Sequence, residues 1–269
     1  MASTTETKNY KFNHSMLRVK DPKESVKFYS FLGMSLIQKL EFPDAKFDLY
    51  FLGYDSAKAA SGGRNVWDRE GLIELTHNYG TETDAEYKIN NGNVEPHRGF
   101  GHTCISVDNI QAACQRIEDA GYKFQKKLSD GRMRHIAFAL DPDGYWVEII
   151  GQKPVEETEN VKETDVETYR MGQGTADREG LLELTWNHGT EKDADFKYHD
   201  GNSQPQGFGH ICVSVDNIEA ACARLESLNV NWKKRLTDGR MKNVAFILDP
   251  DGYWVELVQN ERLSGKANF

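Results

Sequence analysis

The chain has 269 residues, of which 38% are hydrophobic, so its length favours about two domains that each bury a core. The formal net charge of −9 argues against a nucleic-acid partner or an anionic membrane surface, because both require a basic protein face. Nothing approaches the ~18 consecutive apolar residues of a spanning helix, so we expect no membrane partner and a small-molecule substrate.

The N-terminus is polar and lacks the basic flank and apolar centre of a signal peptide. We therefore expect a cytoplasmic protein that starts with a disordered leader, residues 1–9. The four cysteines form two repeat-related pairs, Cys104 with Cys212 and Cys114 with Cys222, without CxxC spacing. Buried reduced thiols are expected, and a thiolate-rich structural zinc site is excluded.

Residues 13–19 predict a strand whose alternation places His14 and Arg18 on one face. Asp21 is a good N-cap for the helix that follows, and Gly33 ends it. Strand-like runs come next at 35–40, 47–52 and 72–76, and in the last of them Glu74 and Asn78 point the same way.

The same order recurs in the next segment, with a strand at 101–107 and a helix at 109–120 that is capped by Asp108 or Asn109. Strands at 136–140 and 145–150 then form a hairpin about an Asp-Pro-Asp-Gly turn. One helix per group of strands predicts an α+β fold.

Residues 99–148 recur at 207–256 with roughly 60% identity, which indicates a duplicated structural unit. The shift is constant, since His102 and His210, like Glu148 and Glu256, are 108 residues apart. Each copy thus begins with a histidine and ends with a glutamate, on separate strands.

The repeat of the first segment is only partial. Residues 177–185 match 68–76, which makes Glu183 the counterpart of Glu74, but nothing corresponds to His14, Arg18 or the helix after Asp21. We divide the chain into a first domain (10–152), an acidic linker (153–168), a truncated second domain (169–260) and a tail (261–269).

Histidines and glutamates on separate strands predict a mixed nitrogen and oxygen metal site, suited to zinc, nickel, iron or manganese. The seven candidate ligands allow one set of four and one set of three. They are His14, Glu74, His102, Glu148, Glu183, His210 and Glu256.

Four motifs, at residues 14–21, 75–78, 99–102 and 141–148, resemble the glyoxalase I (lactoylglutathione lyase) family, and most closely its fused two-domain fungal form. The resemblance covers nearly everything outside leader and linker. It implies a vicinal-oxygen-chelate fold of paired βαβββ modules, with the third module incomplete here. It also implies isomerisation of the methylglyoxal–glutathione hemithioacetal to S-lactoylglutathione, with glutathione as cosubstrate.

The resemblance further implies that the sites form crosswise. His14 and Glu74 would join His210 and Glu256 in one complete site, where Glu256 is the base and Glu74 has the second carboxylate role. His102 and Glu148 would join Glu183 in a site that lacks its strand histidine, with Glu148 as the counterpart base.

Glutathione contacts are carried over from the same resemblance. In the complete site they fall on Arg18, Asn78, Gln206, Arg240 and Met241, with Gln206 at a position where the family often has arginine. In the second half-site they fall on Arg98, Arg132, Met133 and Asn187.

Zn²⁺ is favoured because the long 55–68 loop resembles the zinc-type enzymes, with Ni²⁺ or another divalent ion as the alternative. A monomer is expected, or a dimer formed by module swapping. Two other functions stay open: an extradiol dioxygenase on the same fold, which uses two histidines and one carboxylate on iron, and an inactive or partner-bound truncated isoform.

Overall fold

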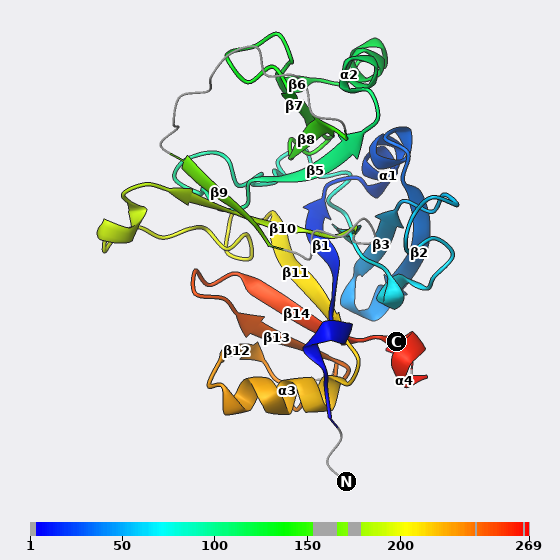
Figure 1. Cartoon of the computed structure of the whole chain (residues 1–269), viewed down its shortest axis with the longest axis vertical. Coiled ribbons are helices and arrows are strands. Elements are labelled where there is room, and N and C mark those ends of the chain that lie inside the picture. The colour runs from blue at the N-terminus through cyan, green and yellow to red at the C-terminus, as the bar shows by residue number, and fades with distance from the viewer. Residues whose placement is uncertain (1–3, 153–165, 172–178, 240, 266, 269) are drawn as a thin grey trace.

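The computed structural model describes residues 4–152, 166–171, 179–239, 241–265 and 267–268, and they form sheets with few helices (Figure 1). The first module (11–78) contains β1 Lys11–Val19, α1 Pro22–Phe31, β2 Ser35–Phe42, β3 Phe47–Gly53 and β4 Leu72–Asn78. Short 3-10 helices lie at Thr7–Asn9, Pro43–Ala45 and Val66–Asp68. Each strand and helix predicted for this segment is confirmed.

The second module (102–151) contains β5 His102–Val107, α2 Ile110–Asp119, β6 Phe124–Lys126, β7 Ile136–Leu140 and β8 Trp146–Gly151. The third (166–187) has β9 Val166–Met171 and β10 Leu182–Asn187, followed by a 3-10 helix at Thr190–Lys192. The fourth (208–259) has β11 Phe208–Val215, α3 Ile218–Ser227, β12 Asn231–Lys234, β13 Val244–Leu248 and β14 Trp254–Gln259, and α4 Glu261–Ser264 follows.

The predicted helix boundaries have the expected chemistry. The carboxylate of Asp21 accepts a hydrogen bond from the backbone of Lys23 and caps α1, and Gly33 leaves the helix with a φ of 98°. The side chain of Asn109 caps α2 in the same way, and Asn217 caps α3.

One eight-stranded sheet joins the first and fourth modules, in the order β12-β13-β14-β11-β1-β4-β3-β2. At its centre β1 runs antiparallel to β11, and each has a parallel neighbour on its other side, β4 or β14. The second module forms its own four-stranded sheet, and β9 pairs with β10. The two halves of the sequence are repeats, but they do not form two separate sheets, because the central sheet contains strands from both halves.

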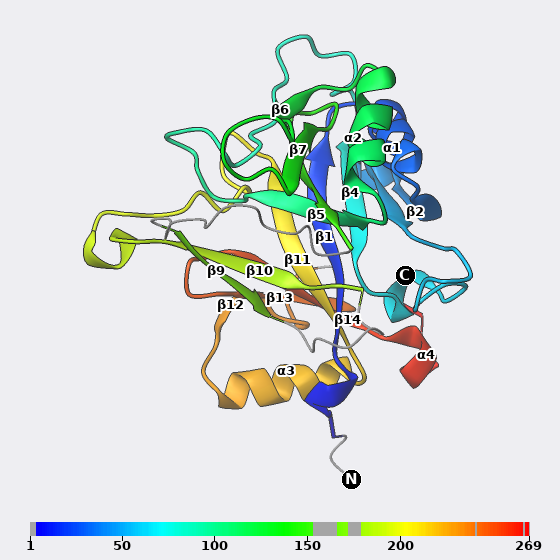
Figure 2. The ribbon, with the colours of Figure 1, turned by 45° about the horizontal axis from the view of Figure 1, so that its top comes forward.

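The main hydrophobic core lies between the first and second modules. It unites Leu17 and Phe28 with Ile105, Ile117 and further buried residues of both modules. α1 and α2 accordingly lie side by side in both views, whereas α3 lies at the opposite end of the molecule (Figure 2). None of the helices in the described residues is long and apolar enough to cross a membrane.

Hydrogen bonds hold the described residues near both chain ends. Thr5, Glu6 and Asn9, which belong to the expected disordered leader, all donate hydrogen bonds to the Asp216 carboxylate at the end of β11. In the tail, the buried Asn268 side chain donates to the Gln259 carbonyl at 2.7 Å. Residues 4–9 of the expected leader are thus held against the end of β11 by partly buried and exposed hydrogen bonds. Of the predicted linker, 153–165 lie outside the described residues, and 166–168 begin β9.

The third module differs from the first in what covers its strand. Leu75 on β4 is 0% exposed under α1, whereas its counterpart Leu184 on β10 is 45% exposed. Between β9 and β10, the described residues contain no counterpart of α1. Within the part of the chain that the structure describes, β10 is therefore an apolar strand without the helix cover that β4 has.

The two Asp-Pro-Asp-Gly turns also differ in whether a helix packs against them. Asp141 is buried and accepts a hydrogen bond from the Tyr29 hydroxyl of α1 at 3.1 Å, besides two from backbone amides of its own turn. Its counterpart Asp249 is only half-buried. Burial, aided by the charge of Asp143, raises the pKa of Asp141 to about 7.

A carboxyl with a raised pKa in the folded state stabilises the fold most when it is protonated. Its contribution is complete below pH 3.8, the unfolded value, and is lost as the pH rises through about 7. Each pH unit across that window therefore costs up to about 1.4 kcal/mol of unfolding free energy.

We expect Asp141→Asn to remove this slope, since the amide keeps the turn's acceptor oxygen and cannot ionise. Urea unfolding at intervals between pH 4 and 7 measures the effect. The matched control Asp249→Asn should change the slope less, because the half-buried carboxyl has more solvent around it. Equal slopes in the wild-type protein and Asp141→Asn would contradict this account.

Candidate metal centre

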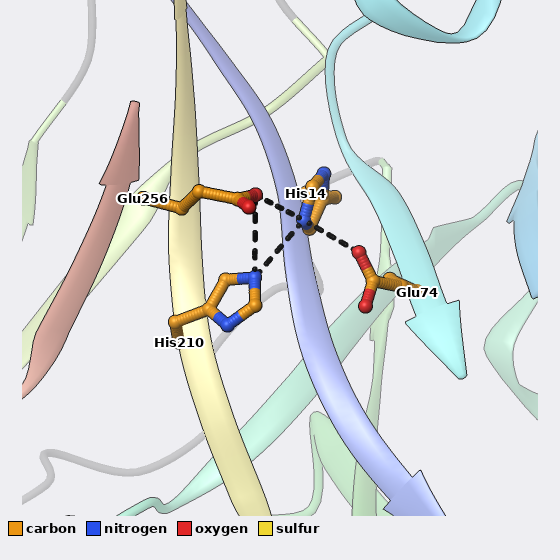
Figure 3. A group of neighbouring side chains, drawn as sticks. All are labelled: His14, Glu74, His210 and Glu256. Carbon is orange, nitrogen blue, oxygen red and sulfur yellow. Dashed lines mark hydrogen bonds and ion pairs between the residues drawn. The ribbon is translucent and has the colours of Figure 1, made fainter. Parts of the chain in front are cut away.

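Each of the four central strands of the eight-stranded sheet contributes one histidine or glutamate to a buried cluster. In sheet order these are Glu256 on β14, His210 on β11, His14 on β1 and Glu74 on β4. Figure 3 shows them converging on one point from segments that are far apart in the chain. The strand alternation predicted for His14 and Glu74 is what turns both toward this point.

The side chains are close enough to share one ion. His14 Nε2 lies 3.0 Å from Glu74 Oε2, 3.4 Å from Glu256 Oε2 and 3.3 Å from His210 Nε2. His210 Nε2 also lies 3.4 Å from Glu256 Oε2. One ligand atom from each residue falls within 4.8 Å of all the others.

Apolar and aromatic side chains surround the cluster. Phe51 meets the His14 ring edge-on at 5.4 Å between centroids, and Phe246 meets His210 at 5.3 Å. Trp67 lies 6.4 Å from His14. Such walls keep water from the four polar groups and strengthen the electrostatic interactions among them.

Burial and the neighbouring charges act in opposite directions on the pKa values of His14 and Glu256. Burial acts to lower the pKa of His14, but Cys212 and the carboxylates of Glu74 and Glu256 raise it well above its ordinary value. Burial acts to raise the pKa of Glu256, but the charge of His210 and hydrogen bonds from both histidines lower it below the usual range.

Glu74 and Glu256 are both buried, and two buried carboxylates require a compensating positive charge. A protonated imidazole supplies it, and so does a divalent cation that displaces the proton. Two imidazole nitrogens and two carboxylate oxygens also suit zinc, nickel, iron or manganese. The residues present therefore fit a metal ion.

Two residues that sequence analysis missed contact the ligands. The Thr76 hydroxyl donates to Glu74 Oε1 at 3.0 Å, which turns the other carboxylate oxygen toward His14. Asn13 Oδ1 lies 2.8 Å from His14 Nδ1. Alternation could have indicated Thr76, which shares the Glu74 face, but it would place Asn13 on the opposite face from His14.

The second predicted cluster is looser and more exposed. His102 Nε2 lies 3.4 Å from Glu148 Oε2 and 3.8 Å from Glu183 Oε1. The His102 side chain is 21% exposed, against 0% for His14. The structure thus brings the three residues together, but in a setting that holds a cation less firmly.

The Arg18 side chain bridges two segments of the chain. Its guanidinium donates to the carbonyls of Gly201, Gly207 and Phe208 at 3.2–3.3 Å and to Asn202 Oδ1 at 2.9 Å. It therefore ties β1 to the 201–208 loop, which leads into β11.

We expect Arg18→Met to lower the unfolding free energy by about 2 kcal/mol, because buried carbonyls lose a charged donor. Thermal unfolding measures this as a fall of several degrees in Tm. Gln206→Met is the matched control, because Gln206 makes one neutral hydrogen bond to the same loop, at 3.0 Å to the Asn202 carbonyl. Equal Tm values for the two variants would contradict the role assigned to Arg18.

The other predicted glutathione contacts that the structure describes are partly or fully exposed. Asn78 lies at the end of β4, Met241 is 40% exposed, and Arg240 lies outside the described residues. In the second half-site, Arg98 pairs with Glu95 at 3.4 Å and the Asn187 amide contacts the Tyr198 hydroxyl. Arg132 and Met133 are exposed.

Comparison with known proteins agrees with this architecture. A sequence model of the Glyoxalase/Bleomycin resistance protein/Dioxygenase superfamily matches residues 11–149 and 150–257. The chain is 45% identical to "Lactoylglutathione lyase" of Schizosaccharomyces pombe over 97% of its own length and 100% of that protein. It is 43% identical to "Glyoxalase I" of Saccharomyces cerevisiae, with 91% of each covered.

The first alignment spans 302 positions, more than the 269 residues of this chain, so the relative has residues that this chain lacks. Among solved structures, glyoxalase I from Zea mays superposes with a TM-score of 0.69 at 24% identity, covering 95% of this chain and 94% of that one. At that identity the likeness concerns the fold.

Proposed function

The chain belongs to the Glyoxalase/Bleomycin resistance protein/Dioxygenase superfamily, and from that premise we propose that it is a lactoylglutathione lyase, a glyoxalase I. The enzyme isomerises the hemithioacetal of methylglyoxal and glutathione to S-lactoylglutathione. The observation that carries the proposal is the buried cluster of two histidines and two glutamates at the centre of the eight-stranded sheet.

In this proposal His14, Glu74, His210 and Glu256 hold a divalent metal ion. When bound, the ion acts as a Lewis acid that stabilises the negative charge of an enediolate. The buried, aromatic surroundings of His14 and His210 support this role, because a dry site strengthens that interaction.

Glu256 is the proposed base. It removes the proton from the carbon that bears sulfur, and the electron pair of that C–H bond moves into the enediolate. The same carboxyl group then delivers the proton to the neighbouring carbon, while the hydroxyl proton of the sulfur-bearing carbon passes to the former carbonyl oxygen. The sulfur-bearing carbon thus becomes the thioester carbonyl, and the atoms of substrate and product are the same. Glu74, held by Thr76, takes the second carboxylate role on the opposite stereochemical face.

Glutathione contacts are proposed for Arg18, Asn78, Gln206, Arg240 and Met241, and in the second half-site for Arg98, Arg132, Met133 and Asn187. Arg18 also holds the loop that carries Gln206. The second half-site, with His102, Glu148 and Glu183, is proposed to contribute little turnover, since it has no counterpart of His14.

The runner-up functions fit less well. An extradiol dioxygenase site has two histidines and one carboxylate, and this cluster has a second carboxylate. An inactive truncated product would not need a complete ligand set. Here the set of four is complete, because its ligands come from the first and fourth modules, whereas the sequence repeat is incomplete in the third module.

The direct test is an assay of thioester formation from methylglyoxal and glutathione by the purified, metal-supplemented protein. Turnover that depends on glutathione supports the proposal. Cleavage of catechols with uptake of oxygen would assign the dioxygenase class, and inactivity in both assays by folded, metal-loaded protein would exclude both enzymes.

Zn²⁺ is the ion we propose, with Ni²⁺ as the alternative, and activity after reconstitution with each ion decides between them. The active unit is proposed to be a monomer, because one chain supplies all four ligands. Size-exclusion chromatography with light scattering tests this. The cytoplasmic location expected from the sequence stays a prediction.

A further inference from the structure

A β-bulge in β1 lies directly before the ligand His14. Phe12 is opposite Val213 on β11 and His14 is opposite Cys212, so β1 has one extra residue, Asn13, between two consecutive partners. In a regular strand the side chains of Asn13 and His14 would point to opposite faces. The bulge re-aims Asn13, and its amide oxygen comes within 2.8 Å of His14 Nδ1.

The orientation of the Asn13 amide is fixed by its other contacts. Its nitrogen donates to the carbonyls of Val66 and Arg69, at 2.8 and 2.9 Å, and the residue is 0% exposed. Two carbonyl acceptors on that side require the NH₂ group there, so the amide oxygen must face His14.

This arrangement determines which nitrogen of His14 carries a proton. An acceptor oxygen at Nδ1 requires an N–H there, so the lone pair of the neutral ring lies on Nε2. Nε2 is the atom that faces Glu74, His210 and Glu256. The hydrogen bond thus selects the tautomer and ring orientation that a metal ligand needs.

The segment that holds Asn13 is itself well anchored. Val66 and Trp67 are buried, and the Arg69 guanidinium bonds to the Arg64 carbonyl at 2.6 Å and to Asp55 at 2.7 Å. The Asn65 side chain caps the 3-10 helix Val66–Asp68 in this loop. The loop therefore acts as a fixed support for Asn13.

We propose that Asn13 is a positioning residue that sets the tautomer and orientation of His14 and thereby the metal affinity of the site. The proposal rests on the metal-dependent function proposed above. Residues that hold a ligating histidine through its second nitrogen typically change metal affinity by about 10- to 100-fold when they are replaced.

Two variants separate positioning from mere support of the loop. Asn13→Leu loses the contacts to both His14 and the loop. Asn13→Asp also loses the two donations to the loop but keeps an acceptor for His14 Nδ1–H. Zinc affinity is measured by competition with a chromophoric chelator. The Tm of the metal-free protein measures how much stability is lost when the loop contacts are removed.

We expect both variants to have a lower metal-free Tm. Zinc affinity should fall about 10- to 100-fold in Asn13→Leu and stay within about threefold of wild type in Asn13→Asp. Asn65→Ala, which loosens the same loop without touching His14, is the matched control and should keep wild-type affinity. If Asn13→Leu does not fold, Asn13→Ala replaces it with the same expectation.

Wild-type zinc affinity in Asn13→Leu would overturn the positioning role and leave the proposed function intact. So would equal losses in Asn13→Leu and Asn13→Asp, because affinity would then follow the loop. Failure of the wild-type protein to bind zinc or any other divalent ion would instead overturn the proposed function, and this inference with it.

Discussion

Glu256→Gln is expected to lower isomerase turnover by about 10³-fold or more, since the amide cannot accept the substrate proton. The substitution keeps the size of a side chain that is 8% exposed between His14 and His210, so the fold should survive. Steady-state rates of thioester formation measure the loss, and unfolding curves verify that the variant is folded.

The sequence repeat supplies the matched control for this prediction. Glu148 is the counterpart of Glu256, opposite Cys104 as Glu256 is opposite Cys212. Glu148→Gln should keep at least half of the turnover, because its cluster has only three ligands. Loss of activity in Glu148→Gln with retention in Glu256→Gln would mean that the looser cluster is the working site.

Removal of the metal is expected to abolish turnover and to destabilise the protein. Without the ion nothing stabilises the enediolate, and two buried carboxylates depend on a protonated imidazole for compensation. Zinc at 100 times its Kd should raise the unfolding free energy by about 2.7 kcal/mol. Activity assays and thermal unfolding after chelation, and again after zinc is restored, measure both effects.

A second matched pair assigns the effect to one cluster. His210→Ala should eliminate both the stabilisation by zinc and the activity, whereas His102→Ala, at the counterpart position, should retain most of each. Full activity of the thoroughly chelated wild-type protein would contradict the metal role. A zinc effect that disappears only in His102→Ala would move the metal to the second cluster.

Both pairs use a feature of the fold that makes the halves unequal. Glu74 and His14 come from a module whose strands are covered by α1. Glu183 comes from β10, and the described residues contain no helix that covers β10 as α1 covers β4. The side chains of the two clusters are of the same types but are buried to different degrees. The degree of burial decides how strongly the charged groups within each cluster interact.

The amino-acid sequence by itself determined the α+β fold class, the strand and helix order of the repeats apart from β6, β9 and β12, and all seven candidate ligands. These follow from local patterns: caps, turn residues, alternation and a constant repeat shift leave little freedom in which residues occupy equivalent places. The crosswise grouping of His14 with His210 was expected from the family resemblance, and the central sheet joins the same two modules.

Only the tertiary structure decided what surrounds those ligands. Asn13 contacts His14 because of a bulge that alternation cannot reveal, and Arg18 binds carbonyls more than 180 residues away in the sequence. Contacts of this kind depend on how distant segments pack, and a side chain takes the partners that packing brings to it. The residue types determined which chemical groups the chain contains, and packing determined which of these groups contact one another.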